Sequence, residues 1–134
     1  GDQGYKTVYQ IPFLIANPGV APTQTPVENP VVLPTVYALR QNYPNPFNPT
    51  TSIAFDVPEA SIVTLKIYNM LGQEVATLLD RQIYDGATSD EADFDASSLA
   101  SGVYLYRLVA VSIDENGKET GNTFTQVKKM VLVK

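Results

Sequence analysis

Between residues 51 and 68, apolar and polar side chains alternate along the chain with a period of two. Apolar residues occupy every second position from Ile53 to Val57, and again from Val63 to Ile67. Because successive side chains of a strand point to opposite faces, each run predicts a strand with one buried face. Residues 58–60 (PEA) separate the two runs and predict a short turn between them.

Further strands are predicted downstream of this pair. They cover residues 74–79, residues 103–113 (VYLYRLVAVSI) and residues 123–133. The dipeptide Asn116-Gly117 between the last two is the strongest short hairpin signal. No helix of three turns is visible in the pattern. About six to eight short strands with closely spaced turns predict an all-β fold, namely an antiparallel β-sandwich.

The first part of the chain has a different composition. All ten prolines lie between Pro12 and Pro58, and from residue 18 to residue 34 a proline recurs at every fourth position. Proline removes a backbone donor and fixes φ, so residues 17–34 are predicted to form an extended spacer. Two interpretations stay open for this spacer, a disordered linker or a segment that lies on a neighbouring surface.

The residues before the spacer, from Tyr5 to Ile15 (YKTVYQIPFLI), have strand-like character. They are expected either to end an upstream domain or to add to a sheet edge, which would allow self-association. The predicted organisation is therefore a Pro-rich linker with the end of an upstream domain in residues 1–36, followed by a β-sandwich domain in residues 37–134.

Composition limits the chemistry that the chain can perform. Of its residues 44% are apolar, the formal charge is −5, and it has no His and no Cys. Imidazole bases, thiolate nucleophiles, disulfides and the commonest metal ligands are thus excluded. Nucleic acid is not an expected partner, since phosphate binding needs clustered basic residues. No apolar run approaches the roughly 20 residues of a transmembrane helix.

The first residues also lack the basic and apolar regions of a signal peptide, so an exported protein would carry its signal upstream. Catalysis is not expected either, because the sequence has neither a Ser-x-x-Lys motif nor a nucleophile elbow. No cofactor is predicted. The acidic segment from Asp85 to Asp95 could offer oxygen ligands to calcium, but its irregular spacing does not match an EF-hand. A solvated loop face is the favoured interpretation, and calcium binding stays open.

Residues 41–51 (QNYPNPFNPTT) carry the densest local signal. Their prolines restrict both themselves and the residues before them, and their asparagines can bond their own backbone. Tyr43 and Phe47 are expected to dock as apolar anchors. The segment therefore predicts a rigid loop beside the first strand.

Basic residues gather near the end of the chain. Four of the nine lie in the last seventeen positions, as Lys118, Lys128, Lys129 and Lys134. On an edge strand they would discourage aggregation or face an acidic receptor. Because this tail is also strand-prone, its edge is expected to be available for pairing with a receptor.

The same segments resemble a known family. LRQNYPNPFNPTTSIAFDVP (39–58), VTLKIYNMLGQEVATL (63–78), DASSLASGVYLYRL (95–108) and KKMVLVK (128–134) occur in this order. Together they resemble the type A C-terminal sorting domain of the type IX (Por) secretion system, over residues 37–134. A related immunoglobulin-like fold occurs in flagellar hook-capping proteins, which are not expected to end in a tail like KKMVLVK.

The resemblance implies an immunoglobulin-like β-sandwich that acts as a non-catalytic secretion signal. Such domains end larger exported proteins of Bacteroidetes and related bacteria, and they direct the parent through the periplasm and an outer-membrane translocon to the cell surface or the medium. The implied partners are the type IX secretion machinery, a sortase-like peptidase that cuts before Tyr37, and the upstream parent domain. The residues assigned to translocon recognition are Pro44, Asn45, Pro46, Gly102, Val103, Tyr104, Lys129, Met130, Val131, Leu132, Val133 and Lys134.

One alternative function stays open, a structural or carbohydrate-binding β-sandwich appended to a secreted enzyme. Carbohydrate binding would need an aromatic platform that faces solvent, and the chain has no Trp.

Overall fold

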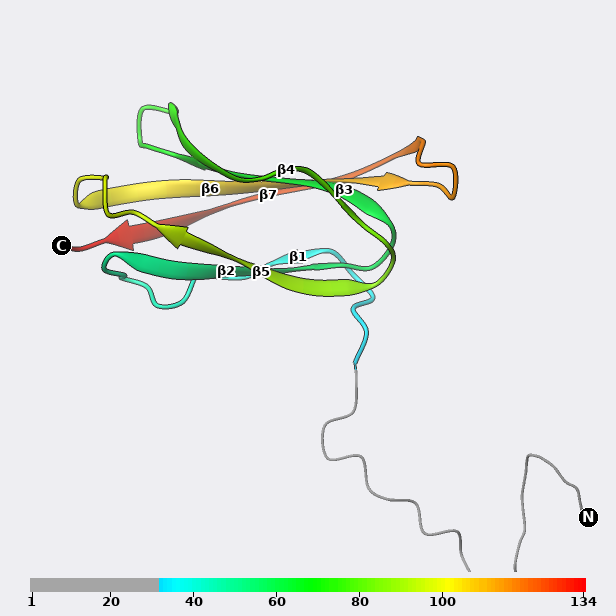
Figure 1. Cartoon of the computed structure of the whole chain (residues 1–134), viewed down its shortest axis with the longest axis horizontal. Coiled ribbons are helices and arrows are strands. Elements are labelled where there is room, and N and C mark those ends of the chain that lie inside the picture. Colours follow the sequence, from blue (N-terminus) through cyan, green and yellow to red (C-terminus); the bar gives the residue numbers. More distant parts are fainter. Residues whose placement is uncertain (1–31) are drawn as a thin grey trace, which may run out of the picture. The chain divides into compact units, whose positions relative to one another are not determined.

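The computed structural model describes residues 32–134. These residues fold into strands without a helix (Figure 1). The strands are β1 (Ala38–Leu39), β2 (Thr50–Val57), β3 (Ser61–Tyr68), β4 (Glu74–Tyr84), β5 (Thr88–Asp95), β6 (Gly102–Ile113) and β7 (Glu119–Leu132). The predicted all-β fold is confirmed. The strand-like segment from Tyr5 to Ile15 and most of the predicted spacer lie outside the described residues, and the domain boundary at residue 37 stays a prediction.

The strands form two antiparallel sheets packed face to face, the arrangement of an immunoglobulin-like sandwich (Figure 1). One sheet has the order β1-β2-β5 and the other the order β4-β3-β6-β7. The predicted turn at residues 58–60 connects β2 to β3. The predicted hairpin connects β6 to β7. Its turn is closed by the Gly117 N–H, which donates to the carbonyl oxygen of Asp114 at 2.9 Å, and Gly117 adopts a φ of +79°.

The acidic segment is a strand and not the predicted solvated loop. The strand expected at residues 74–79 continues to Tyr84, and after a turn at Gly86 the chain returns as β5. This strand pairs with β2 along its whole length, from Thr50–Asp95 to Val57–Thr88. It is an edge strand, on which only Phe94 is buried while the carboxylates are exposed. The alternation of apolar and polar residues is therefore weak in its sequence.

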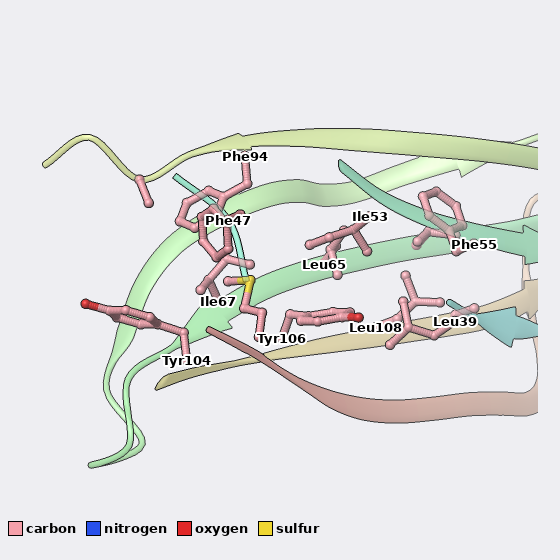
Figure 2. Packing of buried hydrophobic residues seen from close by; sticks show 14 of the residues in the cluster. Leu39, Phe47, Ile53, Phe55, Leu65, Ile67, Phe94, Tyr104, Tyr106 and Leu108 are labelled. Atoms are coloured by element: carbon pink, nitrogen blue, oxygen red, sulfur yellow. The ribbon is translucent and has the colours of Figure 1, made fainter. Parts of the chain in front are cut away.

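The core lies between the sheets and takes alternate side chains from both (Figure 2). The three-stranded sheet contributes Ile53 and Phe55 from β2, and the other sheet contributes Leu65 from β3 and Leu108 from β6. Each of these side chains is fully buried. Burying one such side chain stabilises a fold by about 1.5–3 kcal/mol, so the predicted period of two translates directly into the packing that holds the sheets together.

A tyrosine in the centre of β6 also joins the sheets by hydrogen bonds. Tyr106 is fully buried, and its hydroxyl donates to the carbonyl oxygen of Arg40 at 2.8 Å while it accepts the N–H of Asn42 at 2.9 Å. Figure 2 shows its ring lying between the sheets, beside Leu108. Burial raises the pKa of this hydroxyl to about 12. Tyr106 thus fixes where the chain after β1 lies over the other sheet.

We predict that Tyr106→Phe lowers the free energy of unfolding by about 1–3 kcal/mol, because a buried N–H and a partly buried carbonyl lose their partner. Urea denaturation measures this change. The matched control is Tyr68→Phe, because the Tyr68 hydroxyl accepts its bond from Arg107 on the exposed face, and its change should stay below about 0.5 kcal/mol. Equal losses for the two variants would contradict the assigned role of Tyr106.

Stability should also fall at alkaline pH. The pKa of Tyr106 is about 12 in the folded chain, against about 10 in an unfolded chain. A group whose pKa is higher in the folded chain contributes its full stabilisation at pH values below its unfolded pKa. This contribution is lost as the pH rises through the folded pKa. We expect the free energy of unfolding to drop more steeply between about pH 10 and 12 for the natural chain than for Tyr106→Phe. Parallel curves from urea denaturation would refute this.

Candidate functional site

One end of the sandwich brings together segments that are far apart in the sequence. At this end β2 begins opposite the last residue of β5, in the pair Thr50–Asp95, and β6 begins opposite the last residue of β7, in the pair Gly102–Leu132. The turn between β3 and β4 lies at the same end, since Tyr68 pairs with Leu105 near the start of β6. Figure 1 shows these segments together on the left. We call this region the motif end.

At the motif end the loop before β2 docks along the last residues of β7. The Phe47 N–H donates to the carbonyl oxygen of Val131 at 2.9 Å, and the Val133 N–H donates to the carbonyl oxygen of Phe47 at 3.0 Å. The side-chain oxygen of Asn45 accepts the Val131 N–H at 3.0 Å. The loop therefore runs beside β7 like a short parallel strand, and an isolated bridge joins Phe47 to Leu132.

The edge of the tail is consequently covered, which corrects the expectation that it is available for pairing with a receptor. The side-chain amide of Gln41 extends the contact by donating to the carbonyl oxygen of Lys129 at 2.8 Å. In an edge strand every second residue directs its backbone N–H and carbonyl groups away from the neighbouring strand. On the edge of β7 that faces away from β6, these residues are Lys129, Val131 and Val133. Four of their outward groups, namely the Lys129 carbonyl, the N–H and carbonyl of Val131 and the Val133 N–H, bond to residues 41–47 of the same chain.

The loop is held equally firmly on its other side. Asn42 is buried and its side-chain amide donates to the carbonyl oxygen of Pro44 at 3.1 Å and to the hydroxyl oxygen of Thr51 at 3.0 Å. The Thr51 hydroxyl in turn donates to the carbonyl oxygen of Pro44 at 2.8 Å. The backbone of Tyr43 exchanges two hydrogen bonds of 2.9 Å with Ser52. The predicted rigidity of this loop thus comes mainly from long-range bonds.

Comparison with known families places these segments in one family. A family model described as "Secretion system C-terminal sorting domain" matches residues 41–132. The chain belongs to this family. The domain is a C-terminal sorting signal for type IX secretion, and such a signal implies a secreted protein. A search of curated proteins finds no match. Within residues 32–134 there is no helix long and apolar enough to cross a membrane.

The two aromatic residues of the loop behave differently in this sorting domain. Phe47 is buried as predicted, and its ring packs against Phe94 with 6.2 Å between ring centroids. Tyr43 was expected to dock as well, but it is 82% exposed. It borders a hollow of about 340 Å³ that is also lined by Pro44 and Asp93. Pattern alone could not have found this exposed aromatic, because nothing local in the sequence distinguishes Tyr43 from Phe47.

The start of β6 pairs with the tail along the edge of β7 opposite to the loop. Gly102 pairs with Leu132 and has a φ of +155°, and Val103 pairs with Val131. Tyr104 is buried, and its hydroxyl donates to the carbonyl oxygen of Ala100 at 2.6 Å. These residues shape the turn before β6 and hold β7 in register.

The tail itself has two faces. Met130 and Leu132 are buried in the core, whereas Lys129 and Val133 face solvent. Among the recognition residues predicted from the sequence, the exposed ones are Pro44, Asn45, Pro46, Lys129, Val133 and Lys134. The predicted set thus divides into residues that build the motif end and residues that a partner can touch.

Lys134 is folded back onto the sandwich. Its ammonium donates to the carbonyl oxygen of Ser97 at 2.8 Å, and its backbone N–H donates to the Ser101 hydroxyl at 3.0 Å. Hydrogen bonds from Ser97 lower the pKa of the nearby Asp95 carboxyl, and the positive charge of Lys134 adds to this effect. The turn before β6 therefore holds the last residue of the chain in place.

The carboxylates of β5 are dispersed along the edge of the three-stranded sheet. The Asp90 carboxylate accepts a bond from the Tyr84 hydroxyl at 2.8 Å, and the Asp93 carboxylate accepts one from the Ser52 hydroxyl at 2.7 Å. Within the part of the chain that the structure describes, no group of three or more acidic side chains is placed to hold a metal ion. Strand β5 and the basic tail belong to different sheets, and they come close only where the charge of Lys134 acts on Asp95, the last residue of β5.

We predict that Asn45→Ala loosens the loop from β7. The Val131 N–H loses its acceptor, and its hydrogen exchange should accelerate by roughly fivefold, because a hydrogen bond contributes about 1 kcal/mol. Exchange measured by NMR reports this at single residues. Asn48→Ala is the matched control, since Asn48 is an exposed asparagine of the same loop whose side chain makes no hydrogen bond to residues 32–134. Unchanged exchange at Val131 in Asn45→Ala would show that the loop is held elsewhere.

Proposed function

We propose that the type IX machinery recognises this domain in its folded state, and that it binds the motif end. The docked loop and the outward side chains of the tail would together form the contact. A larger parent protein attached upstream would be carried across the outer membrane by this interaction, passing through the periplasm to the cell surface or the medium.

The docking of residues 41–47 along β7 is the observation that carries this proposal. Asn45 and Val131 lie 86 positions apart in the sequence and share a hydrogen bond. The residues that the family resemblance assigns to recognition come from the loop, the start of β6 and the tail, and all three segments belong to the motif end. A receptor that binds this end reads several matched motifs at once, but only when the chain is folded.

The electrostatic character of the tail fits an acidic partner. Residues 124–134 contain three lysines and no Asp or Glu. Lys129 is exposed on the strand next to the loop, and Val133 adds an apolar side chain that is 51% exposed. Opposite charges across an interface speed encounter and suppress wrong partners, so a receptor surface with carboxylates around an apolar patch would suit this tail.

We further propose that a sortase-like peptidase cuts the chain before Tyr37 and leaves the parent attached to the cell surface. The first buried core residue is Leu39, whereas Val32, Leu33 and Val36 are exposed. A cut in this exposed segment would remove no side chain from the core, so the sandwich would survive cleavage.

The experiment fuses residues 1–134 behind a signal peptide and a reporter in a bacterium with a type IX system. We predict that the double variant Lys129→Glu/Val133→Glu lowers the secreted fraction of the reporter by about tenfold, since a loss of about 1.4 kcal/mol in binding is a tenfold loss of affinity. Neither side chain belongs to the core. A deletion of residues 130–134 would be less informative, because it removes the buried Met130 and Leu132.

The matched control for this experiment is Lys118→Glu, which reverses the charge of an exposed lysine in the hairpin between β6 and β7, at the other end of the sandwich. It should be secreted like the natural chain. If the natural fusion itself stays in the periplasm, the proposed function is wrong. If the double variant and the natural chain are secreted equally, the tail is not part of the recognised surface.

A further inference from the structure

The turn between β3 and β4 displays two large apolar side chains at the motif end. Met70 is 63% exposed and Leu71 is 84% exposed. Residues 69–73 (NMLGQ) carry no charge. Both side chains stand at the tip of a hairpin and outside the hydrophobic core cluster, so the packing of the sandwich does not account for them.

The backbone of this turn is fixed by its own hydrogen bonds. The side-chain oxygen of Asn69 accepts the N–H of Leu71 at 2.9 Å and the N–H of Gln73 at 3.0 Å. The backbone of Asn69 closes the turn by accepting the Gly72 N–H at 3.0 Å and donating to the carbonyl oxygen of Gln73 at 2.9 Å. Gly72 adopts a φ of +83°, which disfavours any residue with a side chain.

A turn that already holds its shape loses little conformational freedom when a partner binds it. Exposed apolar residues on such a turn are therefore well suited to act as contact residues, because most of the burial energy is retained as affinity.

We propose that Met70 and Leu71 form a docking tip that enters an apolar pocket of the type IX machinery, as a second contact beside the loop and the tail. This inference rests on the proposed function. Its position supports it, because Tyr68 pairs both with Glu74 and with Leu105, which sets the tip at the end where β6 begins and β7 finishes. Figure 1 shows the β3–β4 turn and the end of the chain on the same side of the sandwich.

A protein pocket fits this tip better than a lipid surface does. Stable membrane binding by an exposed element needs a large apolar area or neighbouring positive charges that attract anionic lipids. The tip offers two apolar side chains. Of the nearby cations, the Lys66 ammonium is paired with the Glu74 carboxylate at 3.1 Å, and the Arg107 guanidinium lies over the Tyr68 ring and donates to its hydroxyl at 2.6 Å. Methionine adapts its shape to irregular apolar pockets, which also favours a protein partner.

The test uses the same reporter fused to residues 1–134. The double variant Met70→Ser/Leu71→Ser should lower the secreted fraction by about tenfold, the change expected when a central interface contact is lost. The matched control is Ile83→Ser, which removes a 57% exposed apolar side chain from the other end of the same hairpin, where Ile83 pairs with Ile62. The exchange Met70→Leu/Leu71→Met keeps the tip apolar and should preserve secretion.

Thermal unfolding of the purified variants accompanies the secretion assay, and all of them should retain the Tm of the natural chain. Retention of the Ser double variant in the periplasm at an unchanged Tm, with Ile83→Ser secreted normally, supports the docking tip. Equal secretion of the Ser double variant and the natural chain overturns it and leaves the sorting function intact. Failure of the natural fusion to be secreted overturns both. Equal losses for the Ser double variant and Ile83→Ser would also overturn the tip, because general surface hydrophobicity would then explain the effect.

Sedimentation with vesicles of phosphatidylethanolamine and phosphatidylglycerol tests the lipid alternative on the purified chain. No binding is expected. Binding that disappears in the Ser double variant would overturn the assignment of a protein pocket.

Discussion

The fold depends on the hydrogen bonds that hold the chain after β1 against the edge of β7, between the two sheets. The chain after β1 crosses from the three-stranded sheet to the edge of β7, and the buried hydroxyl of Tyr106 fixes the crossing by bonding to Arg40 and Asn42. From there Asn45 and Phe47 reach the backbone of Val131. An unsatisfied buried polar group is costly, so the crossing must follow a path that pairs the buried Asn42 N–H with the Tyr106 hydroxyl.

This closure connects stability with function. Exposed strand edges invite pairing with other chains, and the loop removes that hazard at the tail by occupying its outward backbone groups. A receptor therefore meets side chains rather than a free strand edge. The basic Lys129, the exposed Tyr43 and the Met70–Leu71 tip are displayed on turns and strands whose backbones are already paired. Such a surface exists only after folding, as the proposed recognition of the folded domain requires.

The sequence predicts much of the sandwich but little of the docking. Strands β2, β3 and β6 follow from their period of two, and the Asn-Gly turn predicts the β6–β7 hairpin, because these signals are local. Strand β5 was missed because an edge strand with solvent-facing carboxylates shows little alternation. The bond between Asn45 and Val131 joins residues 86 positions apart, and no local pattern encodes it. The family motifs name segments that the fold brings together at one end, but the structure was needed to separate core residues such as Leu132 from exposed ones such as Val133.

The most direct test of whether the domain must be folded to act as a sorting signal leaves every exposed loop and tail residue unchanged and weakens only the core. Replacing the fully buried Leu65 and Leu108 by Ala should cost about 2–5 kcal/mol each, enough to unfold a domain of ordinary stability. The measurement is the secreted fraction of a reporter fused to the full chain, compared at equal amounts of reporter reaching the periplasm. The account predicts that the Leu65→Ala/Leu108→Ala fusion is retained in the periplasm. Secretion of this unfolded variant at the level of the natural chain would contradict it and show that a linear tail is sufficient.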